Sequence, residues 1–129
     1  MSDSTSAEGG APGASTAGEA RQRAALPDHI HLLGAGGAGL SGAGRILRAR
    51  GHRITGHDRE ASPFTAALAD DGVFVDVGES VADRLPADAQ LVVRSAAVAD
   101  DDPQVVEAEE RGVRVLKYAA LVARLAPEG

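Results

Sequence analysis

Strand-like and helical patterns alternate along the chain from residue 29 onward. Short segments that have the character of strands lie at 29–33, 52–58, 73–78, 89–95 and 113–117. Segments with a helical spacing of apolar residues lie between and after them, at 40–51, 62–72, 103–112 and 118–125. Strands that alternate with helices at this spacing form βαβ units, whose crossovers are right-handed. The pattern therefore predicts an α/β fold: a Rossmann-like doubly wound parallel sheet of about five strands with helices on both faces.

The predicted helices carry local signals of their own. Ser62 followed by Pro63, and Asp102 followed by Pro103, have the arrangement of an N-cap and a first helical position. In the first helix, one buried apolar stripe is expected, formed by Leu40, Ala43, Ile46 and Leu47.

Residues 1–27 differ in composition from the rest of the chain. They are rich in Ser, Thr, Gly, Ala and charged residues, and they contain no aromatic residue. Such a segment cannot bury enough apolar surface to offset its ordering entropy. It also lacks the basic start and apolar centre of a secretory signal. We therefore expect a disordered low-complexity tail at 1–27 and a single folded domain at 28–129.

The composition argues against several classes of function. The formal net charge is -6, there is no long basic run, and the only aromatic residues are Phe64, Phe74 and Tyr118. This argues against a nucleic-acid partner, which needs basic patches or stacking platforms. No apolar run approaches the roughly 20 residues of a membrane helix. The absence of cysteine excludes disulfides and thiolate metal sites and is in keeping with a cytoplasmic protein.

Four glycines join the first predicted strand to the first predicted helix. Their spacing fits G-x-G-x-x-G, which in this context predicts a turn that binds a diphosphate. Gly34 would allow the sharp exit from the strand, and Gly36 and Gly37 would let phosphate approach the backbone. Gly39 would let the helix pack closely on the strand. The N–H groups of the helix start, helped by the Ser41 hydroxyl, would bind the phosphates. A glycine-rich turn that serves packing alone is the alternative.

Asp58 ends the second predicted strand, nineteen positions after Gly39. An acidic residue near this place binds the ribose hydroxyls in NAD-binding domains, so the simplest interpretation of turn and acid together is NAD. A carboxylate here could equally hold the ribose or base of another nucleotide. The third possibility is an Asp that only caps a turn.

The chain resembles the Mur ligases in three segments that follow one another in the same order: HIHLLGAGGAGLSGAGRILRARGHRITGHD, ASPFTAALADDG and LVVRSAAVADDDPQVVEAEERGVRVLKYAALVARL. The resemblance covers residues 28–125 and is strongest to the branch that adds L-alanine. It implies an N-terminal domain that binds the UDP moiety of UDP-N-acetylmuramate, in an ATP-dependent amide ligase of peptidoglycan biosynthesis. The binding residues it implies are Gly34, Gly36, Gly37, Ala38, Gly39, Ser41, Asp58, Arg59, Ser95, Ala96, Ala97 and Val98.

Two positions depart from the family pattern. Ala96 stands where members carry a second serine, so one hydroxyl beside the nucleotide is missing. Glu79 stands where members often carry a histidine, and a carboxylate there would repel a diphosphate. Both departures concern the affinity for the nucleotide rather than the fold.

The family also uses ATP and Mg²⁺, bound in a central domain by a P-loop. The only lysine here is Lys117, with no glycine-rich loop before it. We therefore expect a chain without the ATPase and C-terminal domains, which binds the nucleotide but does not ligate, and which has no catalytic residue and no metal site of its own.

Other interpretations stay open on the sequence. One is an NAD(P)-binding module of a dehydrogenase or regulatory protein, and another is a Rossmann-like scaffold that binds a partner protein. His31 is expected to be a hydrogen-bonded core residue. The other histidines, at 29, 52 and 57, are too scattered to predict a zinc site.

Overall fold

The computed structural model describes residues 26–125. The predicted tail therefore lies outside the described residues up to position 25. Leu26, which the sequence analysis placed at the end of that tail, is buried in the core with 5% of its surface exposed. The ordered packing thus includes the residues just before the first strand.

All five predicted strands are present and form one parallel sheet. They are β2 (His29–Leu33), β3 (Arg53–Asp58), β4 (Phe74–Val77), β5 (Leu91–Arg94) and β6 (Arg114–Lys117). Their order across the sheet is β4-β3-β2-β5-β6, so the direction of winding reverses between β2 and β5. This confirms the predicted doubly wound α/β fold.

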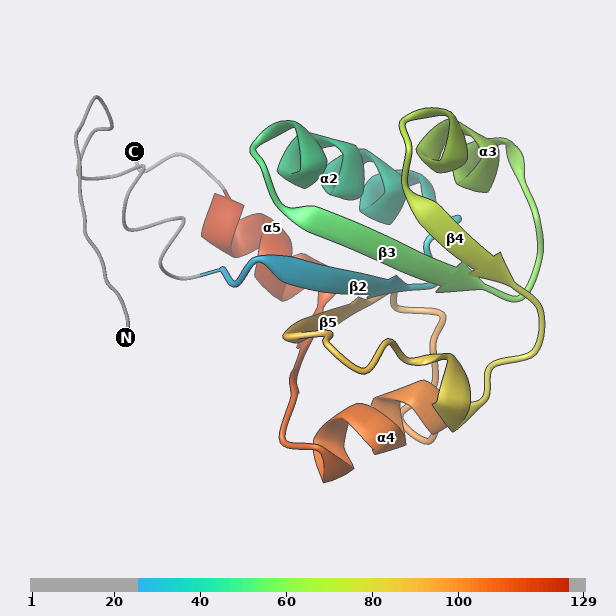
Figure 1. The fold of residues 1–129 in the computed structure, drawn as a ribbon, viewed down its shortest axis with the longest axis vertical. Coiled ribbons are helices and arrows are strands. Elements are labelled where there is room, and N and C mark those ends of the chain that lie inside the picture. Colours follow the sequence, from blue (N-terminus) through green and yellow to red (C-terminus); the bar gives the residue numbers. More distant parts are fainter. Residues whose placement is uncertain (1–25, 126–129) are drawn as a thin grey trace.

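Helices cover both faces of this sheet (Figure 1). One face packs against α2 (Ala38–Ala49), α3 (Pro63–Asp70) and α5 (Tyr118–Leu125). The other face packs against α4 (Pro103–Glu110) and the short 3-10 helix η1 (Ala82–Arg84). Within residues 26–125, no helix combines the length and hydrophobicity needed to cross a membrane.

The predicted helix starts are confirmed. Ser62 caps α3 by accepting hydrogen bonds from the N–H groups of Phe64 and Thr65, and the Thr65 hydroxyl accepts from the Ser62 N–H in return. Asp102 caps α4 by accepting from the Gln104 N–H at 2.8 Å. Each cap satisfies N–H groups that a helix leaves without internal partners.

One predicted core position in α2 is wrong. Leu40, Ala43 and Leu47 are buried, but Ile46 is 50% exposed. At about 100° per residue, Ile46 lies roughly 90° around the helix from the centre of the stripe that Leu40, Ala43 and Leu47 form. Gly44 is instead among the buried residues of α2. A Cβ on Gly44 would lie 2.6 Å from Leu32 Cδ1, so this glycine allows α2 to approach β2 closely.

The sheet face under α4 carries a buried polar layer among its apolar residues. His31 is 1% exposed, with Nδ1 2.8 Å from Thr55 Oγ1 and Nε2 2.9 Å from Gln104 Oε1. This confirms His31 as a hydrogen-bonded core residue. His29 joins the same layer through Thr55, at 2.9 Å.

Candidate functional site

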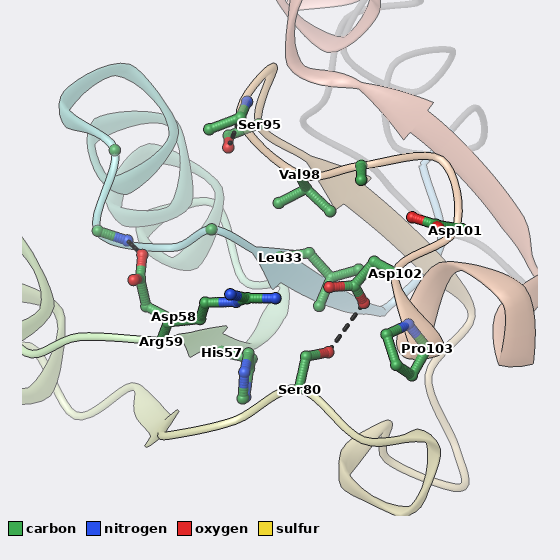
Figure 2. A pocket seen from close by; sticks show the side chains of 15 residues that line it. Leu33, His57, Asp58, Arg59, Ser80, Ser95, Val98, Asp101, Asp102 and Pro103 are labelled. Carbon is green, nitrogen blue, oxygen red and sulfur yellow. Dashed lines mark hydrogen bonds between the residues drawn. The ribbon is translucent and has the colours of Figure 1, made fainter.

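A cavity of about 650 Å³ opens at the carboxyl ends of the strands, where the winding of the sheet reverses. This is the place where doubly wound sheets bind their ligands. Figure 2 shows how its walls come from separate parts of the chain. The turn after β2 and the end of β3 form one side. The turn after β5, the loop after β4 and the start of α4 form the other.

Gly34 makes the sharp turn out of β2, as predicted. Its φ angle is +79°, a conformation that favours glycine. The N–H groups of Gly34 and Ala35 donate to the carbonyl of His57, at 2.9 and 3.0 Å, which holds the turn against β3. A Cβ on Gly34 would lie 2.5 Å from Ser95 Oγ, so the glycine also lets the turn after β5 come close.

Gly36 and Gly37 both line the cavity, but the absence of a side chain makes room for neighbouring protein atoms at Gly36 and leaves open space at Gly37. A Cβ on Gly36 would point into protein, 2.8 Å from Asp58 Oδ2 and 3.1 Å from Ser62 Oγ. A Cβ on Gly37 would meet nothing closer than the Gly34 carbonyl oxygen at 3.4 Å. Gly37 is therefore the position where the absence of a side chain leaves open space at the start of α2, and Gly36 is required by packing.

The sequence predicted that Gly39 lets the helix pack on the strand, and this packing partner is wrong. A Cβ on Gly39 would lie 2.6 Å from the Tyr118 hydroxyl oxygen and 2.8 to 2.9 Å from its ring carbons, so the glycine lets α2 pack against α5 and not against the strand. Ser41 is 4% exposed, and its hydroxyl donates to the Ala38 carbonyl at 3.0 Å. The Ser41 hydroxyl is thus engaged within α2 and does not reach the cavity.

The start of α2 has backbone N–H groups without a side-chain cap. Gly37 is the N-cap and has no side chain to accept from them. The N–H groups of the first helical turn have no partner inside a helix, and they lie at the positive end of the helix dipole. These free donors follow directly after Gly37, which lines the cavity, whereas the N–H groups of Gly34, Gly36 and Gly37 are already engaged within the protein.

Asp58 connects the end of β3 to the glycine turn. Its Oδ2 accepts from the Gly36 N–H at 2.8 Å and its Oδ1 accepts from the Glu60 N–H at 3.1 Å. Figure 2 shows the carboxylate pointing toward that turn. Asp58 therefore stabilises the turn, in agreement with the capping interpretation, while still lining the cavity beside the exposed Arg59.

The turn after β5 forms part of the opposite wall through Ser95, Ala97 and Val98. Arg94 Nη2 donates to Asp100 Oδ1 at 2.5 Å, which closes this turn, and the bond and charge of Arg94 lower the pKa of the Asp100 carboxyl. Ala96 is exposed and is not among the residues that line the cavity.

The loop after β4 is tied to the start of α4. The buried Ser80 hydroxyl donates to Asp102 Oδ1 at 2.8 Å, the same oxygen that caps the helix (Figure 2). Glu79, beside it, is exposed and does not line the cavity. The carboxylate that replaces the expected histidine therefore lies outside the cavity wall.

His57 lines the cavity on the side of β4, and the sequence analysis did not select it. Its Nδ1 lies 2.9 Å from Asp76 Oδ2, and Asp76 also pairs with Arg84 of η1. The His57 side chain is 4% exposed, and its Nε2 is buried with no hydrogen-bond partner in the part of the chain that the structure describes.

Eight of the twelve predicted binding residues line the cavity: Gly34, Gly36, Gly37, Asp58, Arg59, Ser95, Ala97 and Val98. The other four, Ala38, Gly39, Ser41 and Ala96, do not. Sequence reasoning missed the residues that complete the walls: Leu33, His57, Ser80, Ala99, Asp101, Asp102 and Pro103. Asp102 carried a signal, as the predicted helix cap, but its place in the cavity depends on the chain topology. Across residues 26–125, no group of three or more His, Asp or Glu side chains could hold a metal ion.

Comparison with protein families gives a match over most of the chain. Residues 29–128 match the model of the family described as Mur ligase family, catalytic domain. The match covers every described strand and helix and leaves out only residues 26–28 of the described chain.

Curated relatives share this part of their length with the chain. A UDP-N-acetylmuramate–L-alanine ligase of Rubrobacter xylanophilus is 41% identical over 100 residues, which are 78% of this chain and 22% of the relative. The corresponding ligase of Streptomyces coelicolor is 40% identical over 98 residues, 76% of this chain and 21% of the relative. The chain thus spans about one fifth of the length of these relatives.

Solved structures show the same arrangement. The UDP-N-acetylmuramate-alanine ligase of Thermotoga maritima superposes with a TM-score of 0.67 at 29% identity, over 72% of this chain and 21% of that protein. A murein peptide ligase of Psychrobacter arcticus superposes with a TM-score of 0.68 at 27% identity, over 78% of this chain and 21% of that protein.

Proposed function

Because this chain belongs to the Mur ligase family, we propose that it binds the UDP moiety of UDP-N-acetylmuramate as the N-terminal, nucleotide-binding domain of a UDP-N-acetylmuramate–L-alanine ligase. The observation that carries the proposal is the cavity at the reversal of winding, with the glycine turn and the uncapped start of α2 at its edge. The relatives, which are UDP-N-acetylmuramate–L-alanine ligases, support the choice of substrate.

The diphosphate is assigned to the start of α2. Gly37 leaves this edge open, and the backbone N–H groups of the first turn donate to phosphate oxygens. The roles of Ala38 and Gly39 are then those of their N–H groups, since their side-chain positions do not face the cavity. The hydroxyl contact to the nucleotide that the sequence predicted for Ser41 is assigned in this proposal to Ser95, which lines the cavity.

The nucleoside is assigned to the region between the end of β3 and the turn after β5. Arg59, Ser95 and the backbone of residues 97–98 line that region. Asp58 holds the glycine turn by its Oδ2, so its contribution to the nucleotide is first to shape the turn.

The chemistry of ligation is assigned to other parts of a longer protein. Mur ligases are ATP-dependent, and the relatives are about five times as long as the matched region. We place ATP, Mg²⁺ and the amino-acid site there, and we place the whole enzyme in the cytoplasm. The 129 residues contain one lysine and no Gly-x-x-Gly-Lys sequence, in agreement with this division.

Calorimetric titration of the 129-residue chain with UDP, UDP-N-acetylmuramate and NADH tests the proposal. We expect both uridine nucleotides to bind more tightly than NADH. Tighter binding of NADH would instead support the dinucleotide-binding alternative, and no binding of any nucleotide would refute a nucleotide site in this cavity.

A further inference from the structure

Arg59 brings a positive charge into the cavity and has no partner for it among the described residues. Its side chain is exposed and lines the cavity at the end of β3. Figure 2 shows this side chain extending away from Asp58 into the space between the two walls. The guanidinium groups of Arg84 and Arg94, by contrast, are each paired with an aspartate. The Arg59 guanidinium is therefore available to a ligand in the cavity.

The backbone around Arg59 is fixed beside the glycine turn. Asp58 Oδ2 accepts from the Gly36 N–H at 2.8 Å, and Asp58 Oδ1 accepts from the Glu60 N–H at 3.1 Å. The Asp58 carbonyl accepts from the Gly78 N–H at 3.0 Å. Arg59 therefore projects from a held segment, and only its side chain has to be ordered when a ligand binds, which keeps the entropic cost of binding small.

The other charges of the cavity are unfavourable to an anion. The carboxylates of Asp58, Asp101 and Asp102 line the same cavity, and Arg59 is the one arginine or lysine among its described lining residues. Hydrogen bonds to Asp58 and Asp102 offset part of their charge. The start of α2 contributes the equivalent of only roughly half a positive charge. An anionic ligand therefore depends on Arg59 for the one full positive charge that it meets.

The chemistry of UDP decides which of its parts suits an arginine. A guanidinium is always charged and only donates hydrogen bonds, and its planar fork matches the oxygens of a phosphate. Hydrogen bonds between two ionised groups are roughly twice as strong as those between neutral groups. Uridine is neutral, so it gains less from the guanidinium than the diphosphate does. The diphosphate is also assigned to the start of α2, directly after the turn that Asp58 holds.

We propose that Arg59 is a diphosphate-binding residue, whose guanidinium pairs with phosphate oxygens of the nucleotide that the start of α2 also binds. This inference rests on the proposed function. It adds the cation that offsets the carboxylates of the cavity, and it leaves the recognition of the nucleoside to other lining residues.

The variant Arg59→Gln removes the charge and keeps a long polar side chain. It should melt like the unsubstituted chain, because Arg59 is exposed and pairs with none of the described residues. We expect its affinity for UDP to fall by about tenfold or more, the size of one lost charge-assisted hydrogen bond. Arg59→Lys, which keeps the charge but not the fork, should lose less.

The matched control is Arg50→Gln, which changes the net charge by the same amount. Arg50 is exposed and lies at the C-terminal cap of α2, the end of the helix that is away from the cavity. This variant should bind UDP within about twofold of the unsubstituted chain. A loss as large as that of Arg59→Gln would show that net charge alone matters, and would overturn the proposal.

Titrations with uridine, inorganic pyrophosphate and UDP test which part of the nucleotide Arg59 contacts. Uridine should bind equally to the unsubstituted chain and to Arg59→Gln, whereas the affinities for pyrophosphate and UDP should fall together. An equal loss for uridine would overturn the assignment to the diphosphate. A loss for UDP-N-acetylmuramate without a loss for UDP would also overturn it, because Arg59 would then pair with the carboxylate of the sugar.

The dependence of UDP binding on salt gives a second measurement. Dissolved ions screen exposed charges, so the affinity of the unsubstituted chain should fall more steeply with added KCl than that of Arg59→Gln. Equal slopes would contradict a charge pair between Arg59 and the ligand. If the unsubstituted chain binds UDP and Arg59→Gln binds it equally well, this inference fails alone. If the unsubstituted chain does not bind UDP, the proposed function fails with it.

Discussion

At the scale of single residues, His29 and His31 form a hydrogen-bond chain with Thr55 in the polar layer under α4. The Thr55 hydroxyl can donate to only one of the two imidazoles and must accept from the other. Asp88 accepts from His29 Nδ1, at 3.1 Å, so Thr55 donates to His29 Nε2 and accepts from His31 Nδ1 when both rings are neutral. His31 Nε2 then needs a donor. A half-turn of the Gln104 amide supplies it from Gln104 Nε2, which otherwise has no partner among residues 26–125.

The buried position of His31 in these hydrogen bonds leads to a prediction of how the stability of the protein depends on pH. Burial lowers the pKa of His31 from 6.5 to about 4, and the neighbouring His29 and His57 assist the shift. Below pH 6.5 the unfolded chain takes up a proton that the folded protein refuses until about pH 4. The contribution of neutral His31 to the free energy of unfolding should therefore be fully present above pH 6.5. As the pH drops to 4, the free energy of unfolding should fall by about 3 kcal/mol.

Urea denaturation at several pH values between 7 and 4.5 measures this slope. In the His31→Asn variant, the overall stability should be lower but the slope between pH 6.5 and 5 should be smaller, by up to about 1.4 kcal/mol per pH unit. Carboxylates contribute little in that range, because their ordinary pKa values lie below it. An unchanged slope in the variant would show that His31 is not the group that titrates.

Substitutions at Gly36 and at Gly37 should have different effects, the first mainly on stability and the second mainly on UDP binding. Gly36→Ala places a methyl group 2.8 Å from Asp58 Oδ2 and should destabilise the fold by about 1–3 kcal/mol. Gly37→Val should destabilise the fold by no more than about 1 kcal/mol, because its Cβ meets no atom closer than 3.4 Å and its φ angle is -66°, but valine is a poorer N-cap than glycine. The valine lies at the cavity edge, so it should weaken UDP binding by at least about tenfold.

Thermal melts and UDP titrations of the two glycine variants, done in parallel, check both outcomes. A Gly37→Val protein that melts and binds like the unsubstituted chain would contradict the assignment of the diphosphate to the start of α2. Gly36→Ala with an unchanged melting temperature would instead show that Asp58 and Ser62 move aside easily.

At the scale of elements, the start of α4 is held by one carboxylate with two partners. Asp102 Oδ1 accepts from the Gln104 N–H and from the Ser80 hydroxyl, both at 2.8 Å, so the helix cap and the loop after β4 depend on the same atom. The cap fixes the cavity wall as well as the helix, because Ser80 and Asp102 both line the cavity.

Asp102→Ala should therefore cost about 2 kcal/mol of stability, since both contacts are lost, and Ser80→Ala about 1 kcal/mol. Asp102→Asn is the matched control, because its amide oxygen can still accept from both partners. Chemical denaturation of the three variants and of the Ser80→Ala, Asp102→Ala double variant measures the coupling. Strict additivity in the double variant would contradict a shared contact.

The elements themselves were largely predictable from the sequence, because buried strands and capped helices leave local patterns. The pairs Ser62–Pro63 and Asp102–Pro103 mark the starts of α3 and α4 at the residues where the structure has them. Ile46 was predicted to be buried because the apolar spacing does not show that α2 turns Gly44 toward β2. The partner of Gly39 is Tyr118, about eighty positions later, and no local pattern shows that α5 packs beside α2.

The site was predictable only where it is local in sequence. The glycine turn and the end of β3 follow from the order of strand, turn and helix. His57 and Ser80 enter the cavity because β3 and β4 are neighbours in the sheet and the loop after β4 meets α4. These contacts arise from the topology, and they carry no signal in a single sequence.

At the scale of the whole molecule, the lining of the cavity bears on the proposal that these residues bind a nucleotide while the ligation chemistry lies in other parts of a longer protein. The cavity is lined by backbone, small side chains and the carboxylates of Asp58, Asp101 and Asp102, with Arg59 as its cationic side chain. Asp58 and Asp102 are both engaged in holding loops and helix starts. Lys117 is exposed at the end of β6, away from any glycine-rich loop.

The last prediction follows from that arrangement. With ATP, Mg²⁺, L-alanine and UDP-N-acetylmuramate, the 129-residue chain should release no phosphate above background while still binding UDP-N-acetylmuramate. The reason is that phosphoryl transfer needs a lysine and a backbone cradle around the β- and γ-phosphates with a bound Mg²⁺. Residues 26–125 provide no metal-binding cluster, and the sequence has no P-loop. A coupled phosphate assay, run beside the full-length Rubrobacter xylanophilus ligase as positive control, measures the release. Stoichiometric formation of ADP by a pure preparation of the chain would show that the ATP chemistry lies within these residues after all.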